Sequence, residues 1–399
     1  PTLFRSDSNL KIGAYDANDA GSRWSGLIDE VRISDTARSA AWIATEYNNQ
    51  RAPAAFYTVG IEETYGSGAD PFQNGWQYSK KITILASEVA ADLTNFPVLI
   101  RTTDSDWADT SNGGYVARSD GGDIVFMASD RITKLDHEIE KYDETTGELV
   151  AWVEVPSLSA SEDNDIYIYY GNADAVDQWN PTGAGVWEPN YVGVWHLKED
   201  PSGTAPQMKD STANANHGTS YGTMTTGDQV QGNISGSLDF DGSDDEIRFY
   251  DAIIGDRAAW TMTAWIQMDS DTADQRTIYS EGNTTATEYQ FVYVNDSNSN
   301  VKFYMDNPPD YPVLEVSRNV EDSEFHYVAM VQSSKTNREL LVDNISSGTN
   351  TDDAGTFTNN TASIGFLRTD WPADPFLGII DEVRVSKVAR SAAWIETEH

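Results

Sequence analysis

Carboxylate and amide side chains are concentrated in the second half of the sequence, and their oxygen atoms could bind a calcium ion. Calcium takes six to eight oxygen ligands, from carboxylates and from carbonyl groups on turns. The stretch "DSTANANHG", which begins at Asp210, offers both kinds of oxygen in a short segment. The other acidic candidates in this region are Asp239, Asp241, Asp244, Asp245, Asp269, Asp381 and Glu382.

We predict that Asp210 binds a structural calcium ion together with Asn214 or Asn216. Asp381, far along the chain, is expected to complete the site. An alternative stays open, in which Asp210 shapes a turn and Asp381 forms an ion pair with an arginine such as Arg384.

The sequence contains no convincing pattern of catalytic residues. The best pair of carboxylates is Glu138 and Glu140 in "DHEIEKYDE", which would share one face of a strand. A solvated strand face is the favoured interpretation of this pair. The five histidines form no H-E-x-x-H motif and no Ser-His-Asp spacing, and His196 is expected to be a packed core residue. The sequence therefore predicts that the chain is not an enzyme.

Aromatic residues in turns could stack on sugar rings. The segments "DNPPDYPV" and "RTDWPADP" place an aromatic residue beside prolines that would hold a loop still. Tyr304, Tyr311 and Trp371 are the predicted ligand-binding residues, with Tyr221 and Tyr289 as further candidates. In the alternative interpretation, these rings cover one end of the fold or pack against a neighbouring domain.

The chain is strongly acidic and has no cysteine. Its 399 residues include 64 Asp and Glu against 26 Lys and Arg, a formal net charge of −38. Such a surface repels nucleic acid and anionic membranes, so neither is expected as a partner. No apolar run approaches the roughly 18 residues of a membrane-spanning helix, so membrane insertion is not expected. A secreted protein without disulfides relies on a large core or on bound metal.

Glycosylation is a further modification that the sequence permits. Five Asn-x-Ser/Thr sequences occur, and the high content of Asn, Ser and Thr makes several of them expected by chance. The candidate acceptors are Asn233, Asn283, Asn295, Asn344 and Asn359.

Short stretches of alternating apolar and polar residues indicate the elements that position these side chains. Examples are "KITILAS", "DIYIYY", "VKFYM" and "FHYVAMV", separated by clusters of Gly, Asn, Asp and Ser. This pattern is typical of antiparallel β-sandwiches, and it places Trp195, Trp260 and Trp265 in core strands. The segment "LLVDNISSGT" predicts a hairpin with Asp343-Asn344 in its turn. The one helical pattern is "TARSAAWIATEY", residues 36–47, which recurs at residues 388–399.

The start of the sequence repeats its end. "GLIDEVRISDTARSAAWI" begins at Gly26 and "GIIDEVRVSKVARSAAWI" begins at Gly378, an offset of 352 residues. From Gly26 to Glu46, 16 of 21 aligned positions are identical. The sequence therefore predicts a tandem array with a period of about 352 residues.

The last part of the chain resembles a laminin-G-like module of the concanavalin A-type jelly-roll superfamily. The resemblance is carried by "VGVWHLKED", "GSLDFDGSDDEIRF", "WTMTAWIQMDS", "IYSEG", "FHYVAMV" and "GIIDEVRVS", in this order. It implies two antiparallel sheets packed face to face, commonly with a calcium ion near one edge. Residues 188–399 are assigned to this module, and residues 1–50 to the C-terminal fragment of a second copy.

The middle of the chain resembles domain of unknown function 2341, which recurs beside such modules in bacterial and archaeal surface proteins. The matching segments are "WQYSKKITI", "FPVLIRT", "GGDIVFMASD", "LDHEIEKYD", "AWVEVPSLS" and "IYIYYGN". The resemblance implies a β-sandwich over residues 76–187. Residues 51–75, rich in Gly and Pro, are assigned to a linker that contains one strand around residues 56–61.

Together these observations predict tandem all-β jelly-roll sandwiches in a non-catalytic structural or adhesive repeat of a large extracellular or cell-surface protein or filament. The expected partners are neighbouring copies of the same protein, and the N-terminal segment could donate its strands to another chain. The alternative is a calcium-dependent carbohydrate-binding module of a polysaccharide-processing protein or adhesin, with glycans as partners.

Overall fold

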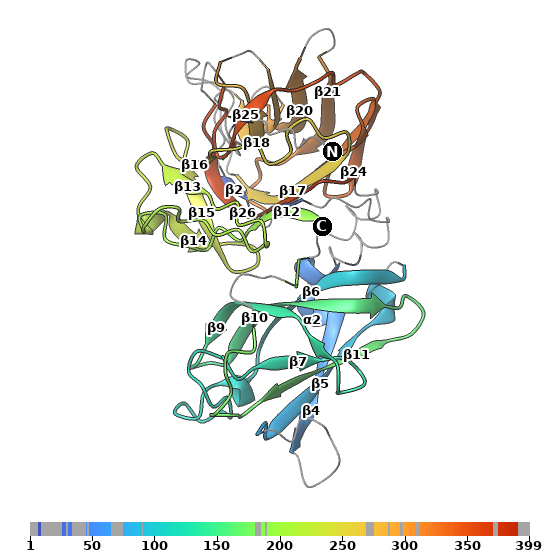
Figure 1. Cartoon of the computed structure of the whole chain (residues 1–399), viewed down its shortest axis with the longest axis vertical. Coiled ribbons are helices and arrows are strands. Elements are labelled where there is room, and N and C mark those ends of the chain that lie inside the picture. Colours follow the sequence, from blue (N-terminus) through green and yellow to red (C-terminus); the bar gives the residue numbers. More distant parts are fainter. Residues whose placement is uncertain are drawn as a thin grey trace. The chain divides into compact units, whose positions relative to one another are not determined.

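The computed structural model describes residues 7–8, 26–28, 31–33, 45, 48–64, 75–89, 91–179, 185–187, 190–268, 275–285, 288–295, 298–307, 311–369 and 374–389. The chain divides into two compact units. The larger unit comprises Pro1–Ala37 and Pro189–Ser391, and the smaller unit comprises Arg38–Glu188 and Ala392–His399. Both consist mainly of antiparallel strands (Figure 1), so the predicted all-β fold is confirmed. None of the helices in the described ranges is long and apolar enough to cross a lipid bilayer.

The smaller unit contains two antiparallel sheets. The first has the order β6 (Leu93–Thr103), β10 (Glu148–Leu158), β9 (His137–Asp143). The second has the order β4 (Tyr57–Thr64), β5 (Tyr78–Ile84), β11 (Asn164–Tyr170), β7 (Val125–Met127), β8 (Lys134–Leu135). The short helical turns of this unit include α2 (Pro53–Phe56), η1 (Ala86–Glu88) and η2 (Ser105–Trp107). Apolar side chains of both sheets, among them Ile100, Trp152 and Ile168, are fully buried, as in a β-sandwich.

Strand β4 lies within residues 51–75, which the sequence assigned to a linker. It is hydrogen-bonded to β5 from Tyr57, opposite Ile84, to Thr64, opposite Tyr78. The strand expected around residues 56–61 is therefore the edge strand of the five-stranded sheet of the smaller unit.

The larger unit also contains two sheets. The eight-stranded sheet has the order β13 (Thr219–Tyr221), β16 (Glu246–Phe249), β25 (Asn359–Ile364), β18 (Arg276–Gly282), β19 (Tyr289–Val294), β20 (Asn300–Asp306), β21 (Val313–Asn319), with β1 (Asp7–Ser8) on β25. The ten-stranded sheet has the order β12 (Tyr191–Trp195), β3 (Val31–Ile33), β26 (Leu377–Ser386), β2 (Gly26–Ile28), β17 (Trp260–Gln267), β22 (His326–Ser334), β23 (Asn337–Val342), β24 (Ile345–Asn350). Off this path, β14 (Gln229–Gln231) pairs with β15 (Gly236–Asp241), which pairs with β26; η3 (Thr226–Asp228) precedes β14.

A single hydrophobic core joins these two sheets. Val292 and Phe303 contribute from the eight-stranded sheet, and Ile266 and Met330 from the ten-stranded sheet. The burial of tryptophan was predicted correctly: Trp195, Trp260 and Trp265 have exposed fractions of 0 %, 1 % and 3 %.

Local turn chemistry was also predicted correctly at the β23–β24 hairpin. Asp343 and Asn344 connect the two strands with φ of 48° and 64°, the left-handed conformation that a tight primed turn requires. The helical patterns at residues 36–47 and 388–399 fall almost entirely outside the described residues.

Candidate functional site

The predicted calcium ligand Asp210 lies in a tight turn after β12 and is 3 % exposed. Its Oδ1 accepts N–H groups of Val194 (3.0 Å) and Thr212 (2.9 Å). Its Oδ2 accepts the Asn216 N–H at 2.8 Å and the Thr212 hydroxyl at 2.9 Å. Burial raises the pKa of Asp210 to about 6, although the hydrogen bonds oppose this shift. The carboxylate therefore organises the turn, and calcium binding by Asp210 stays a prediction.

The two predicted amide ligands serve the same turn. The side-chain nitrogen of Asn214 donates to the Tyr191 carbonyl at 3.0 Å, and that of Asn216 donates to the Val192 carbonyl at 2.7 Å. These bonds tie the loop to β12, so both amides are engaged in holding the turn.

Asp381, the fourth predicted ligand, lies in the interior of β26 and is fully buried. Its Oδ2 lies 3.4 Å from the Ile234 N–H, and burial raises its pKa well above the usual range. In the alternative drawn from the sequence, Asp381 would pair with an arginine such as Arg384, but Arg384 pairs with Glu382. Nη2 of Arg384 contacts Oε2 of Glu382 at 2.7 Å, and Glu382 also contacts Nδ1 of His196.

Strand β26 fills what we call the closing-strand position, between β12 and β15 on one side and β17 on the other. Its antiparallel register is defined by these pairs: Gly193 with Val385, Val194 with Arg384, Trp195 with Val383, Leu238 with Ile380, Ile266 with Ile380 and Gln267 with Ile379. Because the strand is paired on both sides, it lies in the interior of the ten-stranded sheet.

The N-terminal copy of this strand pairs with the same residues of the sheet. The pairs are Gly193 with Ile33, Val194 with Arg32, Trp195 with Val31, Ile266 with Ile28 and Gln267 with Leu27. Each N-terminal residue thus meets the partner of the residue 352 positions later. The two copies also align with one another in parallel, with Gly26 opposite Gly378.

The predicted sugar-binding aromatics of the described residues differ in how far they are exposed. Tyr304 is half-buried against Tyr289 and Phe291 on the face of the eight-stranded sheet that points away from the core. Tyr311 is 50 % exposed, and Trp371 lies outside the described residues. Tyr221 stacks on the Arg248 guanidinium, 3.6 Å from its ring centroid. Glycan binding stays a prediction.

Most of the predicted glycosylation acceptors are inaccessible. Asn283, Asn295 and Asn359 are buried, and the amide nitrogen of Asn233 is buried as well. A glycan needs an exposed amide nitrogen, so burial argues against these four in the folded protein. Asn344, at the β23–β24 turn, remains a candidate.

The carboxylates of the supposed catalytic pair bond to tryptophan. Glu138 accepts the indole N–H of Trp187 at 2.9 Å, and Glu140 accepts that of Trp152 at 2.8 Å. The expectation of a solvated strand face was wrong, because Glu138 and Glu140 are only 4 % and 7 % exposed. The alternating pattern predicts that two residues share a face, but it carries no information about what covers that face.

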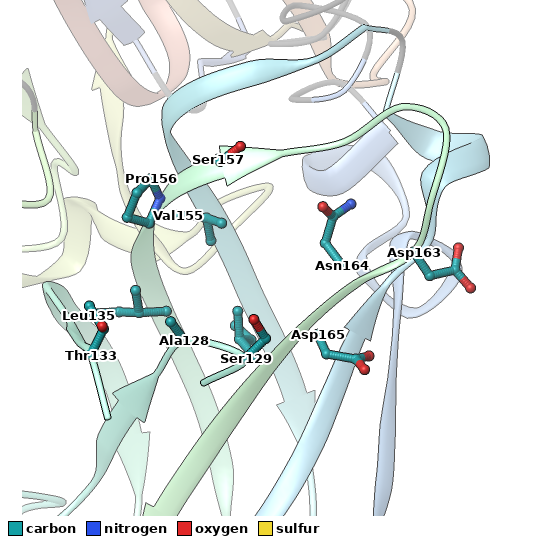
Figure 2. A pocket seen from close by; sticks show the side chains of 11 residues that line it. Ala128, Ser129, Thr133, Leu135, Val155, Pro156, Ser157, Asp163, Asn164 and Asp165 are labelled. Atoms are coloured by element: carbon teal, nitrogen blue, oxygen red, sulfur yellow. The ribbon is translucent and has the colours of Figure 1, made fainter. Parts of the chain in front are cut away.

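A groove of about 440 Å³ opens in the smaller unit between strands of its two sheets. Figure 2 shows Leu135 and Val155 on one side and Asp165 on the other. Asp165 is engaged by Thr83 at 2.7 Å and by Lys81 at 3.3 Å. The side chains that line the groove include no group of titratable residues gathered as for catalysis or metal binding.

One histidine of the larger unit is held between two carboxylates. Nδ1 of His326 lies 2.7 Å from Asp343 and Nε2 lies 2.9 Å from Asp322. With both ring nitrogens facing carboxylates, the imidazole is held in place as a cation rather than as a base for a nucleophile. Burial lowers the pKa of His326, but the hydrogen bonds to Asp343 and Asp322 outweigh it and raise the pKa overall.

We expect His326→Gln to destabilise the larger unit by about 1–3 kcal/mol in mildly acidic buffer, with a smaller loss in alkaline buffer. A pKa that is raised in the folded state stabilises the fold below the unfolded-state pKa, and this contribution disappears as the pH rises through the folded-state pKa. Urea unfolding of both proteins across this pH range checks the sign. A difference in stability that is constant with pH would contradict the ion-pair assignment.

A second acidic group lies in the loop between β15 and β16. Carboxylate oxygens of Asp241, Asp244 and Asp245 lie within 4.8 Å of one another. Burial, followed by repulsion from Asp241, Asp228 and Asp244, raises the pKa of Asp245 to about 7. The sequence signal was three aspartates within five residues around Gly242, but the predicted ligands were chosen elsewhere.

These features define a pair of β-sandwich units without a recognisable catalytic centre in the described residues. Two family models match the chain: residues 240–396 match the Concanavalin A-like lectin/glucanases superfamily, and residues 120–187 match a domain of unknown function, DUF2341. The chain therefore contains a laminin-G-type domain of the concanavalin A-like superfamily, preceded by a DUF2341 domain. Domains of this type are typically binding modules without catalytic activity.

Three solved structures to which the chain is similar are distant from it in sequence. The binding domain of Paraclostridial Mosquitocidal Protein 1 is 11 % identical, with a TM-score of 0.34 over 52 % of this chain and 51 % of that one. The receptor binding domain of botulinum neurotoxin D is 10 % identical, with a TM-score of 0.37 over 52 % and 51 %. A heptameric SAP-like pentraxin from Limulus polyphemus is 12 % identical, with a TM-score of 0.28 over 38 % and 73 %. The chain spans about half the length of the two toxin domains. No curated protein matches the chain.

Proposed function

We propose that this chain is a non-catalytic structural and adhesive repeat of an extracellular or cell-surface protein, and that copies are joined by exchange of the closing strand. The observation that carries the proposal is the shared pairing of two strands. Segments 352 residues apart pair with the same residues of β12 and β17.

A single sheet position accommodates one strand at a time. Each backbone N–H and C=O group on the facing edges of β12 and β17 can complete its ladder with only one neighbour. The N-terminal copy and β26 are therefore alternative occupants of the closing-strand position. When one copy fills it, the other is left to complete the sheet of a second chain.

The N-terminal copy carries the residues that hold β26 in place. Asp381, Glu382 and Arg384 of β26 recur in the sequence as Asp29, Glu30 and Arg32. A buried charge that loses its partner is strongly destabilising, so a strand without these side chains would be a poor replacement. The other differences within the strand are Leu for Ile379 and Ile for Val385, which are conservative, and Ser25 in place of Leu377 at the first residue of the strand.

The test uses engineered disulfides, because the natural chain has no cysteine and any disulfide must come from the introduced residues. Gln267 is opposite both Ile379 and Leu27. We expect Gln267→Cys with Ile379→Cys to give cross-linked monomers. We expect Gln267→Cys with Leu27→Cys to give covalent species as well, including dimers and larger ladders on non-reducing gels.

A matched control combines Leu27→Cys with Asn350→Cys on the distant edge strand β24, and it should stay reduced. If Gln267→Cys with Leu27→Cys also stays reduced while light scattering finds only monomers, the N-terminal copy does not use this position and the proposal fails. If this pair cross-links only within monomers at every protein concentration, the exchange between chains is excluded.

A further inference from the structure

We propose that the loop between β15 and β16 is a calcium-binding site, formed by Asp241, Asp244 and Asp245. Asp241 ends β15, and Asp244 and Asp245 lie in the short connection from β15 to β16 (both strands labelled in Figure 1), with Gly242 at φ 72° making the bend between the first and second aspartate. Their carboxylates gather within 4.8 Å of one another, close enough for one ion to contact all three. This site is separate from the Asp210 turn and does not depend on strand exchange.

The buried carboxylate of Asp245 supplies an unused ligand atom. Asp245 is 2 % exposed. Its Oδ2 accepts the Asp241 N–H at 2.9 Å, but its buried Oδ1 has no hydrogen-bond donor. A buried, unsatisfied carboxylate oxygen costs free energy, and a cation beside it would remove that cost.

The backbone of Gly222 packs closely against this oxygen. A Cβ atom added to Gly222 would lie 2.8 Å from Oδ1 of Asp245 and 2.6 Å from the main-chain oxygen of Asp244. The residue has φ 90°, which disfavours any side chain. A side chain at this position would collide with both oxygens, so the glycine is what allows this part of the chain to pack beside Asp244 and Asp245.

The charge of the loop favours a divalent cation. None of the ion pairs among the described residues involves Asp241, Asp244 or Asp245. Asp228, which caps η3, adds to the negative potential around Asp245. Three carboxylates without a positive neighbour repel one another, and this repulsion is relieved when an ion with two positive charges binds between them.

The donor set selects calcium among common divalent ions. All ligands are oxygens, and the cluster contains no histidine or cysteine of the kind that zinc prefers. Asp241 and Asp244 are exposed, so water molecules can complete a coordination shell of six to eight oxygens around calcium. Magnesium would demand a strict octahedral arrangement of its ligands.

The experiment is a calorimetric titration of the full chain with CaCl2 after treatment with EDTA. We expect a single class of sites with a dissociation constant in the range of about 10⁻⁴ to 10⁻³ M, typical of extracellular modules. Asp241→Asn with Asp244→Asn should weaken binding by about tenfold or more, because two of the three charged ligands become neutral. Both residues are exposed, so circular dichroism should show an intact fold.

The matched control is Asp352→Asn with Asp353→Asn, an exposed aspartate pair of the same unit whose replacement changes the net charge equally. It should bind calcium like the natural chain. The proposal is overturned if the natural chain takes up no calcium or if the two double variants lose affinity equally. It is also overturned if Asn214→Ala abolishes binding while Asp241→Asn with Asp244→Asn does not.

Discussion

Replacing Asp123 with alanine is expected to lower the free energy of unfolding of the smaller unit by about 4 kcal/mol or more. This fully buried carboxylate accepts four main-chain N–H groups, from Ala117 at 3.0 Å, Arg118 at 3.1 Å, Gly171 at 2.8 Å and Asn172 at 3.0 Å. It thereby joins two segments that lie about fifty residues apart. Each buried N–H left without an acceptor costs about 1–3 kcal/mol.

Urea unfolding with hydrogen exchange on peptides that cover residues 115–124 and 168–174 measures this effect. The control is Asp130→Ala, which removes hydrogen bonds to Ile132 and Thr133 from an exposed turn. Water replaces those bonds, so we expect a loss of about 0.5–1 kcal/mol. Equal losses for the two variants would show that the burial of Asp123 is not the source of its contribution.

In the larger unit, Glu281→Ala is expected to lower the free energy of unfolding by about 3–4 kcal/mol. Fully buried, Glu281 accepts N–H groups of Ile253 at 2.8 Å, Ile254 at 2.5 Å and Gly255 at 2.8 Å, and the Tyr279 hydroxyl at 3.2 Å. Burial raises its pKa, although the three main-chain donors oppose this shift.

The conservative variant Glu281→Gln separates hydrogen bonding from packing. Its amide oxygen can still accept, but its amino group faces N–H donors, so we expect an intermediate loss of stability. Thermal unfolding followed by circular dichroism compares the variants, and exchange at residues 253–255 should rise most in Glu281→Ala. If Glu281→Gln is as unstable as Glu281→Ala, the charge of Glu281 contributes more to stability than the number of its acceptor atoms. If neither substitution changes stability, the assigned role of Glu281 is wrong.

The strands were predictable from sequence because their signal is local. Alternation over a few residues indicated the sandwich, and Asp343-Asn344 indicated the hairpin through the φ values that those residue types tolerate. The repeated "IDEVR" segment was equally plain. What it could not reveal was that both copies pair with the same residues of β12 and β17, because strand pairing depends on contacts far apart in the chain.

For the same reason, the sequence alone did not show which of its many acidic residues has an oxygen atom without a hydrogen-bond donor. Asp210 and Asp245 are both aspartates near turns, and only the fold shows that one has donors on both oxygens while the other has a buried oxygen without any. Similarly, Glu138 accepts a hydrogen bond from the indole of Trp187, which lies 49 residues away in the sequence. Residue types indicated which hydrogen bonds and ligand atoms were possible, and packing between distant segments determined which hydrogen bonds form.

The pairing of β12 with β26 determines how the larger unit responds to tension. The strands are antiparallel, and Tyr191 at the start of one lies opposite Ser386 at the end of the other. Just outside this pair, the Lys387 N–H donates to the Asn190 carbonyl at 3.4 Å. A load applied through residues 190 and 387 pulls on the same end of both strands. It therefore breaks the interstrand hydrogen bonds one pair after another, instead of loading all of them at once in shear. In a stretched array of such repeats, β26 would peel away from β12 at low force, and the vacated edge would be offered to an incoming strand.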